Sequence, residues 1–181
     1  MNGDSVTANT YVGSGVAGSS ANYVYNRLQL TRQTNLPYDW SWLVRGTGQL
    51  ASNDLIVSEQ LGAGGVDTVR GYDERAESGS RGVLVSTELY TPAFSLAKLV
   101  SDHDINDSGQ LLAFYDYGHV ADMHLQQSTP THTELSSVGF GARYNIKRYL
   151  DVRFDYGWQL ERLPGEPHVG NLASISVTTS Y

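Results

Sequence analysis

Hydrophobic and polar residues alternate along much of the C-terminal half of the chain. Over 150–161 the even positions are apolar, from Leu150 to Leu160, while the odd positions are polar or glycine, from Asp151 to Glu161. The same period of two runs through 138–147 and 173–181. A period of two is typical of strands whose two faces differ in chemistry. The pattern therefore predicts amphipathic strands rather than helices.

Earlier segments alternate less regularly but still favour strands. Segment 110–119 places Tyr115 and Tyr117 on one face and Asp116 on the other. Residues 1–18 are small and polar, which fits one strand followed by a loop. No helical period is long enough to compete, so we predict about seven or eight strands. The earlier predicted strands cover 22–34, 38–50, 83–90 and 110–119.

The expected connections differ in length, since 146–150 is tight while 92–109, 121–134 and 162–170 are longer and polar. Short turns at one end and long loops at the other are typical of outer-membrane barrels. Aromatic residues such as Trp40 lie near predicted strand ends, as in the girdles at membrane interfaces. We predict an all-β fold, an antiparallel transmembrane β-barrel. The alternative is a soluble β-sandwich binding module with one buried face per strand.

Composition narrows the functional classes. Only 17% of the 181 residues are charged, against about 25% in typical soluble domains. A net charge of −7, from 12 basic and 19 acidic residues, excludes a strongly cationic nucleic-acid binder. The absence of cysteine removes disulfides, thiol nucleophiles and cysteine zinc sites. The sequence also has no apolar run of about 18 residues and no signal-peptide pattern at its start.

Residues 51–82 interrupt the strand pattern with a loop of about thirty residues, a length that is usually functional. Its centre contains Val69, Arg70, Gly71 and Tyr72, with one arginine among glycines that allow close backbone approach. A phosphate-binding loop does not fit, because no Gly-Lys-Ser/Thr follows. The plain alternative is a solvated hairpin tip.

Two motifs carry a resemblance to a known family. VRGY at 69–72 follows SEQLGAGG, and FYDYG places Phe114, Asp116 and Gly118 two strands later. Together they resemble the motifs of the BamA-like outer-membrane superfamily, and most closely its two-partner secretion branch, the hemolysin-activator (ShlB/FhaC/HecB) transporters. The resemblance extends over about residues 20–181.

The resemblance implies a sixteen-stranded barrel of which this chain supplies the C-terminal half, with loop 51–82 folded into the lumen. There Arg70 would meet Asp116 on the inner wall. The strand phase independently places Asp116 on the face opposite Tyr115, and an arginine–carboxylate pair can be bidentate. Glu88 shares the lumenal phase and is a plausible second acceptor. Tyr181, ending the last strand, resembles the terminal assembly signal of outer-membrane proteins, in which phenylalanine is commoner.

By this resemblance, the chain would take part in ATP-independent translocation of a partner exoprotein, a hemolysin or an adhesin, across the outer membrane of a Gram-negative cell. Its expected partners are that exoprotein, outer-membrane lipid and the outer-membrane assembly machinery, with no nucleic acid. A BamA-like insertase is the alternative within the superfamily. Residues 1–181 are expected to form a single partial barrel without the signal peptide, POTRA domains and further strands of the family. We therefore expect transport only as part of a longer chain.

Catalytic and metal chemistry are disfavoured. No histidine pair has tight ligand spacing, three of the five histidines lie in predicted loops (His103, His132 and His168), and the other two are His119 and His124. No G-x-S-x-G nucleophile motif occurs. The acidic residues Asp151, Asp155 and Glu161 interleave with Arg153 and Arg162, as a polar lumen wall would. We expect no catalytic residue, metal or cofactor, and hence no enzyme.

Overall fold

The computed structural model describes residues 23–100, 106–122 and 132–181. Its described part is built almost entirely from strands, with one short helix, α1 (Ala97–Val100), and a 3-10 turn, η2 (Pro37–Asp39). The strands are β1 (Tyr25–Asn35), β2 (Ser41–Ala51), β3 (Leu61–Ala63), β4 (Glu77–Gly79), β5 (Arg81–Tyr90), β6 (Asp107–Ala121), β7 (His132–Ile146), β8 (Leu150–Gln159) and β9 (Asn171–Thr179).

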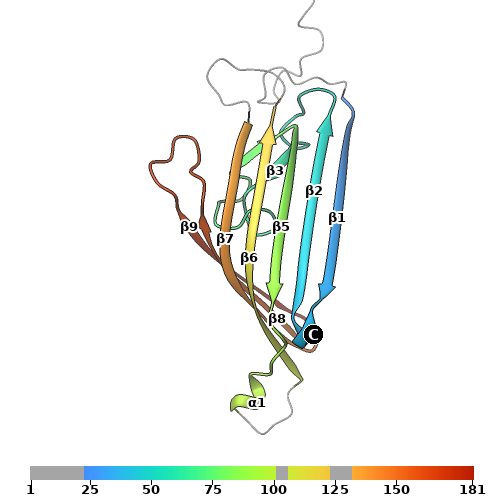
Figure 1. Cartoon of the computed structure of the whole chain (residues 1–181), viewed down its shortest axis with the longest axis vertical. Helices are drawn as coiled ribbons and strands as arrows, with labels where there is room; N and C mark the ends of the chain where they lie inside the picture. Colours follow the sequence, from blue (N-terminus) through green and yellow to red (C-terminus); the bar gives the residue numbers. More distant parts are fainter. Residues whose placement is uncertain (1–22, 101–105, 123–131) are drawn as a thin grey trace, which may run out of the picture.

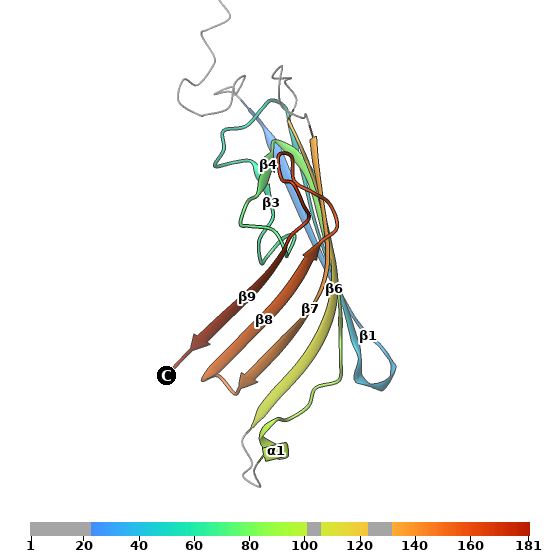
Figure 2. The ribbon, with the colours of Figure 1, turned by 90° about the vertical axis from the view of Figure 1, so that its left-hand side faces the viewer.

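Seven strands form one antiparallel sheet in the order β1-β2-β5-β6-β7-β8-β9, and β3 pairs with β4 in a separate small hairpin. Neighbours in the large sheet are also neighbours along the chain, apart from the inserted hairpin (Figure 1). Figure 2 shows that the sheet is curved and that β3 and β4 lie on its concave side. The described strands form an open, curved wall, consistent with part of a barrel. The all-β prediction is confirmed, and the two-sheet sandwich alternative is wrong.

The two faces of the sheet follow the alternation in the sequence. On β6, Leu112, Phe114 and Asp116 are buried on the concave face, while Leu111 and Tyr115 are exposed on the convex face. Phe140 on β7 is likewise 48% exposed. An apolar outer face that faces no other part of the protein is what lipid contact requires of a transmembrane barrel wall.

Strand β7 begins at His132, six residues before the predicted start at 138. Buried and exposed residues do not alternate over the first part of β7, since Leu135, Ser136 and Ser137 are all buried in succession. His132 therefore lies in a strand, and its predicted place in a loop is wrong. The strand expected within 1–18 lies outside the described residues.

The expected separation of short and long connections is wrong for one segment. The connection between β5 and β6 lies at the same end as the tight β7–β8 turn, because antiparallel strands alternate in direction (Figure 1). Its described part is tied to the start of β6: the backbones of Phe94 and Gly109 exchange hydrogen bonds of 2.9 and 2.7 Å, and Ser95 donates to Asp107. β6 accordingly begins at Asp107, inside the predicted loop 92–109.

The long segment between β2 and β5 packs on the concave face. Leu61, Ala63, Val69 and Tyr72 from this segment form the main hydrophobic cluster with residues of the sheet, namely Leu84, Val120 and Leu135. The core of the described fold therefore lies between the loop and the wall, not between two sheets. In the part of the chain that the structure describes, no helix is long and apolar enough to cross a membrane.

Candidate functional site

Both ends of the long loop are held at one point at the end of β6. The Asp122 carboxylate accepts hydrogen bonds from the Ser80 backbone N–H at 2.9 Å, the Ser80 hydroxyl at 2.7 Å and the Gln60 amide at 3.3 Å. The Ser80 hydroxyl also accepts from the backbone N–H of Leu55 at 2.8 Å. We call Gln60, Ser80 and Asp122 the base clamp, since it joins the two ends of the loop to the sheet.

The loop tip contains a tight turn that presents Arg70 to the wall. Gly64 and Gly65 have φ angles of 105° and 104°, a region that side chains with a Cβ rarely adopt. The Thr68 hydroxyl donates to the Gly64 carbonyl at 2.8 Å, and the Gly65 N–H donates to the Val69 carbonyl at 3.2 Å. The glycines noted in the sequence therefore serve the geometry of the tip.

Arg70 and Asp116 form a bidentate ion pair. Nε of Arg70 lies 2.7 Å from Oδ2 of Asp116, and Nη2 lies 2.8 Å from Oδ1. The backbone N–H of Arg70 donates to the same Oδ2 at 3.1 Å. Arg70 is 4% exposed and Asp116 is fully buried. Parallel N–H···O bonds of this kind combine charge attraction with a fixed orientation.

Four further groups of the wall surround the same guanidinium. Nη1 of Arg70 lies 2.8 Å from Oε1 of Glu88 and 3.3 Å from Oδ1 of Asp155. Nη2 donates to the Ser86 hydroxyl at 3.2 Å, and the guanidinium carbon lies 3.5 Å from the centre of the Phe114 ring. A cation over an aromatic face gains additional electrostatic attraction.

Two more arginines flank the carboxylates. Arg45 on β2 lies 2.6 Å from Glu88, and Arg143 on β7 lies 2.8 Å from Asp155. Among the described residues, three arginines thus face three carboxylates, so the charges of the site balance. Burial alone would lower the pKa of Arg70, but Asp116 first, and Glu88 and Asp155 after it, raise that pKa above its ordinary value. Arg70 stays charged while docked.

Glycines of the wall make room for the loop. A Cβ on Gly157 would lie 2.8 Å from the backbone nitrogen of Gly71, and one on Gly118 would lie 2.9 Å from Cγ2 of Val69. A Cβ on Gly139 would lie 2.3 Å from the Phe114 ring, whose face contacts the Arg70 guanidinium. Gly118 of the FYDYG motif is thus needed for loop packing, whereas Phe114 and Asp116 contact Arg70.

Tyr72 and Gln159 attach the tip to the end of β8. The Tyr72 hydroxyl lies 3.0 Å from the Ser136 carbonyl and 2.6 Å from the Glu161 carbonyl. The Gln159 amide donates to the Gly71 carbonyl at 2.8 Å. Burial raises the pKa of Tyr72, so its hydroxyl remains a donor.

The structure brings together both motifs singled out in the sequence, with Glu88 beside them. Tyr181 lies exposed at the end of the chain, apart from this site. Sequence reasoning read Asp155 only as part of a polar wall, and it did not single out the other groups that complete the site. These other residues all occupy inward-facing positions of their strands, which is the one feature of the sequence that could have indicated them. They are Arg45, Ser86, Arg143, Gly157 and Gln159.

The structure describes His119, His132 and His168, and His168 lines a cavity together with Gly71 and Gln159 at the edge of this site. His119 and His132 stack with ring centroids 5.8 Å apart, and His119 faces Glu134 at 3.5 Å. His103 and His124 fall outside the described residues. In the described ranges, no group of three or more histidine or acidic residues is arranged to hold a metal ion.

Comparison with known families identifies the chain. A model of the family described as haemolysin secretion/activation protein ShlB/FhaC/HecB matches residues 6–144. The chain belongs to this family. Both the loop motif and the FYDYG motif fall inside the matched region, so the ShlB/FhaC/HecB resemblance read from them is confirmed.

Named relatives of this ShlB/FhaC/HecB member come from Haemophilus influenzae. A heme/hemopexin transporter protein HuxB from strain 86-028NP is 33% identical over 128 residues, which cover 67% of this chain and 21% of the relative. A second HuxB, from strain ATCC 51907, is 32% identical over 124 residues, or 65% of this chain and 20% of the relative. The chain thus aligns with about a fifth of each relative.

Proposed function

We propose that this chain forms part of an outer-membrane transporter that secretes a partner protein. The observation that carries the proposal is the docking of Arg70 into a carboxylate-lined site on the concave wall. In a closed barrel the concave face would line the lumen and the apolar convex face would meet lipid. Loop 51–82 would then occupy the lumen, and Arg70 with Asp116 would latch it to the wall.

A buried ion pair between Arg70 and Asp116 would hold the loop firmly in the lumen while the transporter is closed. Removing one partner of a buried ion pair leaves an uncompensated charge, which costs about 3–5 kcal/mol. The docked position of the loop therefore depends on both Arg70 and Asp116. Passage of an extended chain along a polar lumen needs no nucleotide, and we propose that transport is independent of ATP.

The partner we propose is a secreted exoprotein of the hemolysin or adhesin kind. The matched relatives are named for heme/hemopexin transport, so a partner that handles heme/hemopexin is the first cargo to test. Insertion into the outer membrane would use the assembly machinery. The transporting unit would be a longer chain than these 181 residues.

The test is secretion of the partner by the full-length protein carrying Arg70→Ala or Asp116→Ala. We expect secretion to be lost while the heat-modifiable gel mobility of an assembled barrel is kept. Arg32→Ala is the matched control. Thr31 on β1 faces inward and lines the cavity under the loop, so Arg32, the next residue of the strand, faces the opposite side. Normal secretion by both latch variants would refute the proposal.

A further inference from the structure

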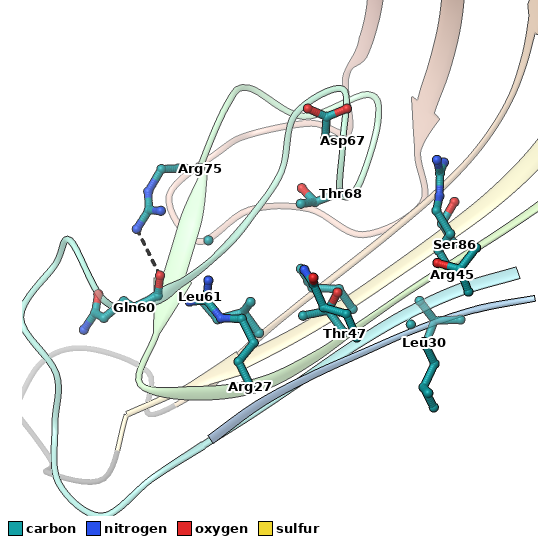
Figure 3. Close-up of a pocket in the computed structure, with 16 residues that line it drawn as sticks. Arg27, Leu30, Arg45, Thr47, Gln60, Leu61, Asp67, Thr68, Arg75 and Ser86 are labelled. Atoms are coloured by element: carbon teal, nitrogen blue, oxygen red, sulfur yellow. Dashed lines mark hydrogen bonds between the residues drawn. The ribbon is translucent and has the colours of Figure 1, made fainter. Parts of the chain in front are cut away.

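A cavity of about 420 Å³ lies between the docked loop and the wall formed by β1, β2 and β5. Figure 3 shows Arg27 and Arg45 on the wall side of this cavity and Arg75, Gln60 and Asp67 on the loop side. Its volume falls within the range of about 300–1,000 Å³ typical of ligand sites. Space for a ligand therefore remains beside the loop while the latch is closed.

Two of the lining arginines are held by neutral groups. Arg27 donates through Nε to the Gln49 amide oxygen at 2.6 Å and through Nη2 to the Glu59 carbonyl at 3.3 Å. Arg75 donates through Nη2 to the carbonyls of Val57 at 3.0 Å and Gln60 at 3.3 Å. Since the Glu59 and Gln60 carbonyls belong to consecutive residues, both guanidiniums contact the same short stretch of loop backbone.

The side chain of Arg75 is held over the loop backbone. A Cβ on Gly62 would lie 2.9 Å from Cγ of Arg75 and 3.1 Å from its guanidinium carbon. The absence of a side chain at Gly62 thus lets Arg75 cross the β3–β4 hairpin toward the cavity. Its position is set by packing as well as by hydrogen bonds.

The cavity carries an excess of positive charge although the whole chain is acidic. Among the described residues, neither Arg27 nor Arg75 forms an ion pair with a carboxylate, while Arg45 is paired with Glu88 at 2.6 Å. Asp67 is the one acidic residue among the described residues that line the cavity. A guanidinium has five N–H donors, so Arg27 and Arg75 retain donors for an anionic ligand.

We propose that this cavity binds carboxylate side chains of the polypeptide being secreted, with Arg27 and Arg75 as the binding residues. The proposal rests on the proposed function and names the part of the cargo that this cavity recognises. Both arginines are exposed to solvent, so each contact is weak and easily exchanged. Weak contacts suit a site that a moving chain must leave as readily as it enters.

The geometry also gives the docked loop a second role. Arg75 reaches the cavity only while the β3–β4 hairpin lies on the wall, because Gly62 and Gln60 hold its side chain there. The cargo site is therefore complete in the latched state. An acidic segment of the cargo would bind beside the loop before the latch opens.

The experiment measures binding of a fluorescent eight-residue peptide of alternating glutamate and serine to the full-length protein in detergent, by anisotropy. The control peptide has glutamine in place of glutamate. We expect the acidic peptide to bind, more weakly as salt rises, and the glutamine peptide to bind at least about tenfold more weakly, as loss of charge-assisted hydrogen bonds requires.

Arg27→Gln/Arg75→Gln should weaken binding of the acidic peptide by at least about tenfold, whereas Arg32→Gln, on the same strand as Arg27, should leave it unchanged. Equal binding of both peptides, or unchanged binding by the double variant, would overturn the proposal. Should the double variant fail to assemble, Arg75→Gln alone decides, since Arg75 is exposed and lies on the loop rather than in a strand of the large sheet. Secretion that depends on Arg70 without peptide binding would reject this site and leave the proposed function intact.

Discussion

A Cβ atom on Gly157 would lie 2.8 Å from the backbone nitrogen of Gly71 and 2.9 Å from the carbonyl carbon of Arg70. The tip of the loop therefore rests directly on the backbone of β8. Gly71 itself has a φ of 92°, so neither glycine can be replaced without strain or collision. The latch depends on backbone contact as much as on charge.

Gly157→Ala should release the loop tip while leaving the barrel assembled. The added methyl group meets backbone atoms, and overpacking of this kind costs about 1–3 kcal/mol. Because the chain has no cysteine, Val69→Cys can report docking through its reaction with a maleimide. Labelling should become at least about fivefold faster. Gly48→Ala, where a Cβ meets nothing within 4 Å, is the control and should leave the rate unchanged.

The charge swap Arg70→Asp/Asp116→Arg should not restore secretion. An aspartate at position 70 would face Glu88 and Asp155, which lie 2.8 and 3.3 Å from the present guanidinium. Like charges repel, so the swap places a carboxylate beside Glu88 and Asp155, which the guanidinium of Arg70 now attracts. Secretion and Val69→Cys labelling should match those of the single variants. Recovery of secretion would show that Arg70 and Asp116 act as an isolated pair.

Tyr72→Phe should weaken docking without abolishing it. Loss of the hydroxyl leaves the carbonyls of Ser136 and Glu161 without this partner, at a cost of about 1–3 kcal/mol. Hydrogen exchange should rise both in the loop and near Glu161. Tyr38→Phe provides the control, since Tyr38 is 89% exposed. A change confined to the loop would mean that Tyr72 does not couple it to the β8–β9 connection.

Glu77 should make packing of the β3–β4 hairpin depend on pH. Burial raises the pKa of Glu77 above 4.5, although a hydrogen bond from Thr133 partly opposes the shift. The docked hairpin therefore binds the proton more tightly than the free loop does. Its stabilisation is fully present below pH 4.5 and declines as pH rises through the raised pKa. Protection factors of hairpin amides should show this decline, and Glu77→Gln should remove it.

Much of the wall could be predicted from the sequence, because period-two alternation survives wherever one face is apolar and the other polar. β8, predicted as 150–161 and found as Leu150–Gln159, illustrates this. Alternation was lost at Leu135–Ser137, where the loop buries consecutive residues of β7. A local sequence pattern cannot show that a strand is covered by a segment distant in the sequence.

The same limit applies to the site. Arg70 and Asp116 stood out because each lies in a motif, whereas Asp155 could be recognised only as an inward-facing acid. Its contact with Arg70 joins residues 85 positions apart. Arg45 and Arg143 reach the site from two other strands, and their pairing depends on sheet register, which strand periodicity does not specify.

The base clamp turns the loop tip into a tethered ligand. While Gln60 and Ser80 both hydrogen-bond to the Asp122 carboxylate, a released Arg70 stays attached near its docking site through a short segment of the loop. Short flexible tethers give effective concentrations of about 1 mM. An intrinsic dissociation constant of about 10 μM would then keep the tip docked about 99% of the time. In the proposed transporter, such a loop would close again by itself after each passage, and the rate of reclosing would be set by the tether rather than by any encounter between molecules.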